Sequence, residues 1–227
     1  MSRVSAPTDS RIRCVVLGGG GHASVVVDAL LASGALDACA VLDSDSRRWG
    51  TELFGVPVRG GDELLPELVR QGVTGFVVGV GGVGDNRPRK RLFELGLAHG
   101  LQPVTVQHPS AICSTRAKVG VGTVLLAGSV VNAGAVLGVN VILNTGAIVE
   151  HDCVIGDHVH LATGAKLASA VRVGKLAHIG IGAAVRQCLS IGEGAVVGAG
   201  AVVVNEVAPW TVVVGIPARP LPASRTS

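Results

Sequence analysis

Apolar and small residues recur every six positions along the second half of the chain. Cut from Ile112, residues 112–207 divide into sixteen consecutive hexads without a break. The second place is Val, Leu or Ile in fifteen of them, with Cys113 as the exception, and the sixth place is mostly small. A period of six suits neither a helix, with its period of 3.6, nor an amphipathic strand, with its period of 2. It predicts a coil with flat sides, in which each hexad supplies a short strand and a turn and three hexads close one triangular turn.

Such a coil is a solenoid whose turns are buried only by their neighbours. The aliphatic second residue points to the axis, and successive coils stack about 4.8 Å apart. The outward first and fourth places of the early hexads are also apolar, and a monomer would expose them. Three-fold packing of such prisms would bury this surface and create clefts between subunits. The residues concerned are Val124, Ala127, Val130, Ala133, Val136, Ile142 and Ile148.

The first 107 residues follow a different pattern. Apolar runs at 13–17, 39–42 and 76–80 alternate with helical patterns near 22–31, 63–71 and 87–99. Strands that alternate with helices predict a small parallel α/β domain. We therefore expect a loose tail at 1–10, a Rossmann-like domain at 11–107, an all-β prism with a C-terminal segment at 108–221, and a second tail at 222–227.

Composition excludes several classes of protein. A net charge of +3 with 15% charged residues is too weak and dispersed for nucleic acid. No apolar run approaches the ~18 residues of a membrane span, and the polar start of the chain lacks the apolar core of a secretory signal. The five cysteines are odd in number and form no C-x-x-C, which argues against a disulfide framework or a zinc knuckle. A reducing cytoplasm is the simplest location.

A glycine-rich loop joins the first predicted strand to the first predicted helix. Glycines at positions 18–21 let backbone N–H groups approach a ligand, and a helix N-terminus favours an anion. Gly18-x-Gly20-x-x-Ala23, with Asp43 about 25 residues later, fits a loose dinucleotide fingerprint. The domain is short for NAD, so a nucleotide sugar is favoured, and a purely structural turn is the third alternative.

Histidine spacing within the hexads adds a geometric constraint. His160 and His178 are 18 residues apart and should stack one coil above the other, whereas His158 falls at a corner, where we expect it to be solvated. His151 is nine residues, half a coil, from His160. The two should face different sides of one prism and meet only across an interface between subunits.

Five motifs together resemble a family of hexapeptide-repeat (left-handed β-helix) sugar acetyltransferases. This family comprises nucleotide-amino-sugar N-acetyltransferases of the bacillosamine and perosamine type and sialic-acid O-acetyltransferases. The likeness spans nearly the whole chain, and it implies a Rossmann-like domain followed by a left-handed parallel β-helix. The motifs are the glycine loop with His22, Gly84-x-Asn86-x-x-Arg89, the His-Pro-Ser run at 108–110, the Glu-His-Asp run at 150–152 and the Gly-Ile-Pro-Ala-Arg run at 215–219.

The resemblance implies transfer of acetyl from acetyl-CoA to the amine of a nucleotide-linked amino sugar. His151 would be the general base, since a neutral imidazole accepts a proton near physiological pH. Asp152 would orient it, which requires a chain corner because neighbouring strand residues point to opposite faces. The implied substrate-binding residues are Gly20, His22, Asp43, Asp45, Asn86, Arg89 and His160.

For acetyl-CoA, the resemblance implies binding in a cleft between the subunits of a cytoplasmic homotrimer, with no metal or redox cofactor. Ser169 stands where the family commonly has glycine, which keeps a backbone donor but takes space. The implied acetyl-CoA-binding residues are Ser169, Gly180, Ile181, Pro217 and Arg219.

Three other functions remain open. O-acetylation of a free sugar such as sialic acid would need no nucleotide. A zinc hydratase can use the same β-helix with three histidines between subunits. Such hydratases lack an α/β front domain, and the histidine spacing here does not resemble their triad. A non-catalytic sugar-nucleotide sensor would bind without turnover.

Overall fold

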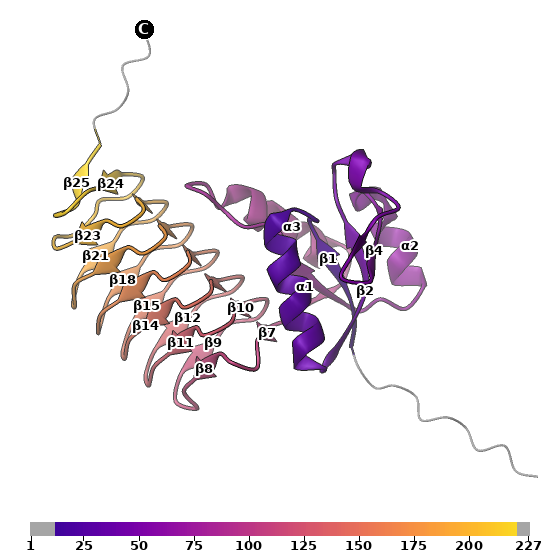
Figure 1. The fold of residues 1–227 in the computed structure, drawn as a ribbon, viewed down its shortest axis with the longest axis horizontal. Coiled ribbons are helices and arrows are strands. Elements are labelled where there is room, and N and C mark those ends of the chain that lie inside the picture. Colours follow the sequence, from indigo (N-terminus) through magenta and orange to yellow (C-terminus); the bar gives the residue numbers. More distant parts are fainter. Residues whose placement is uncertain (1–11, 222–227) are drawn as a thin grey trace, which may run out of the picture.

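The computed structural model describes residues 12–221. The tails expected at 1–10 and 222–227 lie outside these residues. The described chain forms an α/β domain, here called the front domain, followed by a left-handed parallel β-helix, here called the prism (Figure 1).

The front domain is built on one six-stranded sheet with the order β3-β4-β2-β1-β5-β6. All neighbouring strands are parallel except β3 and β4. Residues of α1 share one buried cluster with one face of this sheet, and residues of α2 and α3 share another with the opposite face. The elements are β1 (Ile12–Leu17), α1 (Gly21–Ser33), β2 (Leu36–Leu42), β3 (Glu52–Leu53), β4 (Val56–Gly60), α2 (Leu65–Arg70), β5 (Gly75–Val78), α3 (Arg87–Ala98) and β6 (Gln102–Pro103), with 3-10 turns η1 (Ser46–Arg48) and η2 (Asp62–Leu64).

The prism has three flat faces, and every one of the sixteen hexads begins with a two-residue strand at its first two places. Face 1 consists of β7 (Val106–Gln107), β10 (Val124–Leu125), β13 (Ile142–Leu143), β16 (His160–Leu161), β19 (His178–Ile179), β22 (Val196–Val197), β24 (Val212–Val214) and β25 (Arg219–Pro220). Face 2 consists of β8 (Ile112–Cys113), β11 (Val130–Val131), β14 (Ile148–Val149), β17 (Lys166–Leu167), β20 (Ala184–Val185) and β23 (Val202–Val203). Face 3 consists of β9 (Lys118–Val119), β12 (Val136–Leu137), β15 (Val154–Ile155), β18 (Arg172–Val173) and β21 (Ser190–Ile191). The prism therefore begins at β7, two residues before the predicted start of the second domain.

The second and sixth places of each hexad fill the axis of the prism, as the pattern predicts. Leu125, Leu143 and Leu161 from second places and Ala147 and Ala165 from sixth places are all buried in one continuous core. The fifth place turns the corner in the left-handed backbone region, which favours glycine. Asp152 and Asn140 take that conformation with φ of 61° and 52°, at a strain that Asp and Asn tolerate better than most residues.

The front domain covers the start of face 1 (Figure 1). Val26 and Val27 of α1 share a buried cluster with Val106, Val124 and Leu126. The sequence pattern predicts Val124 and Ile142 on an exposed outer face, and this is wrong because both side chains are fully buried. The repeat pattern predicts which residues point outward from the prism, but it does not predict which of them the front domain covers. No helix formed by residues 12–221 has the length and apolar character to cross a membrane.

Candidate active site

The glycine loop leaves the first turn of α1 open. Gly18 has a φ of 96°, and a Cβ there would overlap the side chain of Val80. Among residues 12–221, a Cβ at Gly20 or Gly21 would meet no atom within 4 Å, and no side chain caps α1. The unpaired N–H groups of this 13-residue helix are therefore accessible to an anion.

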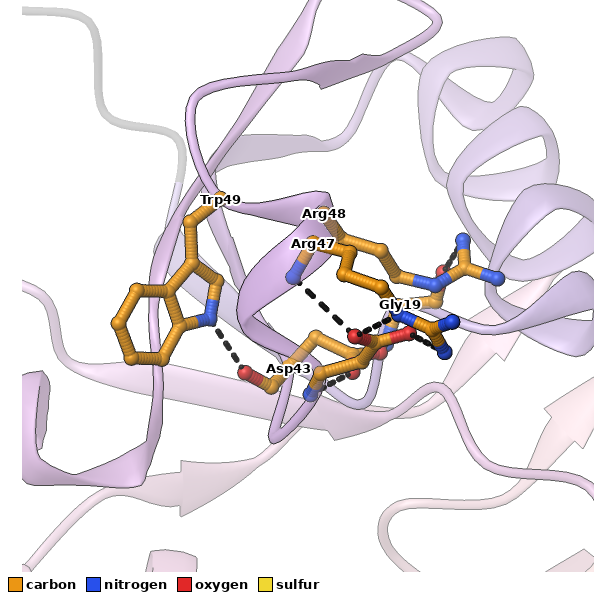
Figure 2. Close-up of polar contacts among 6 residues, drawn as sticks. Gly19, Asp43, Arg47, Arg48 and Trp49 are labelled. Carbon is orange, nitrogen blue, oxygen red and sulfur yellow. Dashed lines mark hydrogen bonds and ion pairs between the residues drawn. The ribbon is translucent and has the colours of Figure 1, made fainter.

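Asp43 holds the glycine loop in place (Figure 2). One carboxylate oxygen accepts the Gly19 N–H at 2.6 Å and the other accepts the Asp45 N–H at 2.7 Å. The Trp49 indole N–H donates to the Asp43 carbonyl at 2.8 Å, and Arg48 donates to the Gly19 carbonyl at 2.9 Å. Asp43 also lines a small cavity of about 90 Å³ beside Gly18, so it both supports the loop and faces a potential ligand.

Asp45 is paired within the protein rather than free. Its carboxylate receives two side-chain hydrogen bonds from Arg47 at 2.8 Å each. This pairing holds the pKa of the Asp45 carboxyl below its usual range, with the side-chain hydrogen bond as the largest cause. A ligand that uses Asp45 must compete with an exposed arginine.

Asn86 and Arg89 join the two domains, and their positions do not support the predicted contact with nucleotide. Arg89 is fully buried and donates to the Val80 carbonyl at 2.6 Å and to the carbonyl and side-chain oxygens of Asn140 at 2.8 and 2.6 Å. Asn86 donates to the carbonyls of Leu176 and Ala177 at 3.1 and 2.9 Å. Both side chains thus hold the start of α3 against the prism by hydrogen bonds. Burial lowers the pKa of Arg89 to about 9, which leaves it charged at neutral pH.

His158 is buried rather than solvated, which corrects the expectation for a corner residue. It is 8% exposed, and its Nδ1 lies 3.0 Å from the amide nitrogen of Asn140, the residue that binds Arg89. The ring of Phe93 packs against it at a centroid distance of 5.6 Å. The front domain again accounts for the difference, because Phe93 belongs to α3.

Three histidines converge where the front domain meets face 1. His160 and His178 are register partners on β16 and β19, as predicted, with ring centroids 5.0 Å apart. The ring of His22, from α1, lies 6.1 Å from that of His160. Burial lowers the pKa of His22 to about 4 and that of His160 to about 3, and it lowers the pKa of His178 as well. The cluster is therefore neutral at physiological pH.

The hydrogen bonds of His160 define its tautomer. Its Nδ1 lies 2.7 Å from the Gly82 carbonyl and must be the protonated donor. Its Nε2 then accepts from the Asn144 amide at 3.2 Å, and Asn144 is fixed by the Thr145 N–H at 2.8 Å. Asn144 and Gly82 were not predicted. The hexad register could have predicted the contact of Asn144. This residue holds the third place of its hexad, one coil below His160 and at the edge of the same face.

A cavity of about 380 Å³ lies beside this cluster. The loop 82–84 of the front domain forms one wall, and face 1 with the corner between faces 1 and 2 forms the other. The predicted residues His160, Gly180 and Ile181 line it together with His178 and Asn144. The walls are otherwise mostly apolar, with Val83, Val196 and Ala199 among them.

His151 and Asp152 occupy the corner between faces 2 and 3, where the side chains are 58% and 67% exposed. His151 Nδ1 lies 2.8 Å from Asp152 Oδ2. A carboxylate only accepts, so Nδ1 carries a proton, and in the neutral imidazole Nε2 carries the lone pair. No side chain or backbone group of residues 12–221 hydrogen-bonds to this Nε2. Ser169 lies one coil further along the same corner, and its neighbour Ala170 donates to the His151 carbonyl at 3.0 Å.

The predicted site residues of one chain thus form two separate groups. His151, Asp152 and Ser169 lie at the corner between faces 2 and 3. The glycine loop, His22, His160, Gly180 and Ile181 lie around face 1 and the corner between faces 1 and 2. Face 2 separates the groups. Pro217 and Arg219 lie at the far end of the prism, where Arg219 is exposed on β25.

No group of three or more His, Cys, Asp or Glu side chains within residues 12–221 has the arrangement of a metal site.

Comparison with known proteins covers both domains. Residues 13–95 match the family described as the PglD N-terminal domain. A UDP-N-acetylbacillosamine N-acetyltransferase of Bacillus subtilis is 37% identical over 118 residues, which is 49% of this chain and 50% of that protein. The matched segment thus spans about half the length of that relative.

Solved structures match along nearly the whole chain. Perosamine N-acetyltransferase from Caulobacter crescentus, in a histidine-to-asparagine variant complexed with CoA and GDP-perosamine, is 39% identical with a TM-score of 0.86, covering 92% of this chain and 97% of that one. The acetyltransferase domain of PglB from Neisseria gonorrhoeae, complexed with acetyl coenzyme A, is 38% identical with a TM-score of 0.84, covering 93% and 100%.

Proposed function

Because the chain belongs to the family of hexapeptide-repeat nucleotide-amino-sugar N-acetyltransferases, we propose that it transfers acetyl from acetyl-CoA to the amine of a nucleotide-linked amino sugar. The observation that carries this proposal is the free Nε2 of His151, whose other ring nitrogen donates to Asp152. The Caulobacter relative, whose structure holds CoA and GDP-perosamine, supports an amine acceptor over the hydroxyl of a free sugar.

His151 acts as the general base in this proposal. Its Nε2 removes a proton from the sugar amine as the amine nitrogen attacks the thioester carbonyl. The C–N bond forms, the carbonyl becomes a tetrahedral oxyanion, and Asp152 stabilises the imidazolium ion. Collapse breaks the C–S bond, and the proton passes to the departing thiolate of CoA. The products are an acetamido sugar nucleotide and free CoA.

The Ser169 N–H is a candidate donor to that oxyanion. It lies one coil above His151 on the same corner and donates to no acceptor within residues 12–221. A backbone N–H in this position stabilises developing negative charge without reorganisation. A serine at this position keeps the backbone N–H that a glycine would offer.

The nucleotide diphosphate would lie on the open N-terminus of α1, at Gly20 and Gly21. Asp43 would support the loop beneath it, and His22 would lie on the side that faces His160 and the 380 Å³ cavity. In this arrangement the sugar points toward the prism. Asn86 and Arg89 contribute by holding the two domains together.

The pantetheine arm of acetyl-CoA would run along the corner between faces 1 and 2. The backbone N–H groups of Ile181 and Ala199, at equivalent places of successive coils, donate to no acceptor within the described residues 12–221. Both residues line the cavity, next to Gly180. Pro217 and Arg219 lie further along the prism, where the nucleotide end of CoA would reach.

Assembly as a homotrimer would complete this site. Face 1 is partly covered by the front domain, and face 3 presents exposed Val136 and Val154 together with the polar residues Lys118, Arg172 and Ser190. Face 2 presents a mostly apolar column, from Ile112 at 65% exposure through half-buried Val130, Ile148, Ala184 and Val202, with Lys166 among them. Packing face 2 around a three-fold axis buries this column. It also brings the His151 corner of one subunit toward the cavity of its neighbour.

Acetyl-CoA and nucleotide sugars are cytoplasmic metabolites, and this supports a role in the cytoplasm. An acetamido sugar nucleotide is a donor for glycan assembly, so a glycosyltransferase would consume the product.

The test is thiol release from acetyl-CoA with a panel of UDP-, GDP- and dTDP-linked amino sugars, comparing the wild type with His151→Ala. We expect turnover on one amino sugar and a loss of about 10²–10⁴-fold in kcat in the variant. Activity only with a free hydroxylated sugar would replace this proposal by O-acetylation. Binding of the sugar nucleotide without any turnover would indicate a sensor.

A further inference from the structure

His178 presents one ring nitrogen to the 380 Å³ cavity and has the other sealed from solvent. The residue is 7% exposed and lines the cavity. Its Nδ1 is buried without a hydrogen-bond partner within residues 12–221. In a neutral imidazole one nitrogen carries the proton and the other accepts, and a proton on Nδ1 would have no acceptor within the described residues. The ring proton is therefore best placed on Nε2, the nitrogen that can reach a ligand.

His160, the other imidazole of the cavity, has no donor to spare. Its Nδ1–H is used by the Gly82 carbonyl, and its Nε2 already accepts from Asn144. The T-shaped packing of the two rings, at 71° and 5.0 Å, fixes His178 against a ring that is itself fixed. His178 is thus the histidine of this cavity that is equipped to donate to a ligand.

The surroundings of His178 select a neutral acceptor. The remaining wall is largely apolar, with Val83, Ile181 and Val196, and none of the described lysines or arginines (residues 12–221) lines the cavity. A neutral N–H in such a wall suits a carbonyl oxygen better than a phosphate, which needs charge or several donors. The unpaired backbone N–H groups of Ile181 and Ala199 line the same cavity and offer the same chemistry.

We propose that His178 Nε2–H donates a hydrogen bond to a carbonyl oxygen of the pantetheine arm of acetyl-CoA and so sets the affinity for the acyl donor. This rests on the proposed function, because it requires acetyl-CoA in the cavity. His178 positions the donor substrate and takes no part in proton transfer, which belongs to His151.

The test compares His178→Phe with His178→Gln. Phenylalanine keeps a ring against His160 and removes the donor, whereas glutamine restores an N–H donor of similar reach. We expect His178→Phe to raise the KM for acetyl-CoA and the Kd for CoA, measured by calorimetry without sugar, about tenfold, the loss of one hydrogen bond. The KM for the sugar nucleotide should change less than about twofold, and His178→Gln should recover most of the affinity.

A spectroscopic measurement keeps the proposal testable if a variant does not fold. In wild-type protein with ¹⁵N-labelled histidine, CoA should move the Nε2 resonance of His178 while the Nδ1 resonance of His160 stays in place. A rise confined to the KM for the sugar nucleotide would assign His178 to the acceptor and overturn the proposal. The proposal would also be overturned if wild type and both variants bind CoA equally well and CoA leaves the Nε2 resonance of His178 unmoved. Failure of the wild type to bind CoA at all would instead overturn the proposed function.

Discussion

His151 Nδ1 lies 2.8 Å from Asp152 Oδ2, although the two residues are consecutive in the chain. Consecutive side chains on a strand point to opposite faces, so this contact needs a corner. The left-handed backbone of Asp152, with a φ of 61°, supplies it. The catalytic pairing that we propose is therefore a property of the hexad itself, whose fifth place turns the chain.

This geometry makes Asp152→Asn the informative substitution. Asparagine tolerates the left-handed conformation as well as aspartate does, so the corner should persist while the charge that stabilises an imidazolium ion is lost. We expect kcat to fall at least about tenfold with little change in either KM. The measurement is steady-state kinetics by thiol release. Asp28→Asn, on the exposed side of α1, is the control, and an unchanged kcat in Asp152→Asn would remove Asp152 from the mechanism.

The glycine loop offers a substitution that separates binding from folding. The Cβ of an alanine at Gly20 would meet no atom of residues 12–221 within 4 Å, and the φ of −71° there is ordinary for alanine. We expect a change in the free energy of unfolding within about 0.5 kcal/mol. The KM for the sugar nucleotide should rise about tenfold, because the methyl group occupies the approach to the helix N-terminus.

Gly79→Ala is the contrasting variant for that measurement. Its Cβ would overlap the Gly18 carbonyl oxygen, so both the melting temperature and nucleotide binding should fall. If Gly20→Ala leaves the KM for the sugar nucleotide unchanged, the diphosphate does not approach this turn.

Arg89 should contribute mainly to the junction between the domains. Arg89→Met keeps most of the buried volume but leaves the Val80 carbonyl and two oxygens of Asn140 without their donor. Each unsatisfied acceptor costs about 1–3 kcal/mol, partly offset because a buried charge is no longer desolvated. We expect a net loss of about 2 kcal/mol in urea denaturation. Arg91→Met, on the exposed side of the same helix, should be near neutral, and equal effects of the two variants would contradict the role of Arg89 at the junction.

The sequence predicted the repeat far better than the junction. The hexad register gave every strand from β8 to β23 and the stacking of His160 on His178, because each coil obeys the same local rule. The sequence predicted the wrong surroundings for Arg89, His158 and Val124. The reason is the same for all three: the groups that surround each side chain come from the other domain. No periodicity within the prism encodes α1 or α3, and an arginine three residues after Asn86 has the same sequence pattern whether it meets phosphate or a carbonyl.

Two histidines that desolvation keeps neutral should make stability depend on pH. In an unfolded chain a histidine titrates near pH 6.5, whereas burial lowers the pKa of His22 to about 4 and that of His160 to about 3. Between these values the unfolded chain binds more protons than the folded one, so the free energy of unfolding decreases as pH falls below about 6.5. The slope should reach at most about 1.4 kcal/mol per pH unit for each histidine.

The slope can be measured by urea denaturation between pH 5 and 6.5. His22→Gln keeps a polar side chain without a group that titrates in this range, and it should reduce the slope. His151→Gln, at an exposed corner, controls for the loss of one imidazole. A slope that His22→Gln leaves unaltered would show that His22 is not held neutral in the folded protein.

The separation of His151 from the glycine loop by face 2 yields a prediction about assembly that one mixed sample can test. Two inactive chains are needed: His151→Ala, which lacks the base, and Gly20→Trp, whose large side chain fills the open space at the helix N-terminus. If base and nucleotide pocket came from the same subunit, every site in a mixture would carry a lesion and activity would stay at background. If they come from neighbouring subunits, a site is intact when a Gly20→Trp chain supplies the base to a His151→Ala chain.

Random mixing in equal amounts makes about a quarter of the sites intact in a closed ring. We therefore expect co-expressed chains, purified as one assembly, to recover about 25% of wild-type kcat per site while each variant alone stays inactive. Recovery that disappears when Ile148→Glu is added to both chains would tie the effect to face 2, and no recovery in a mixed trimer of verified composition would place the whole site within one subunit.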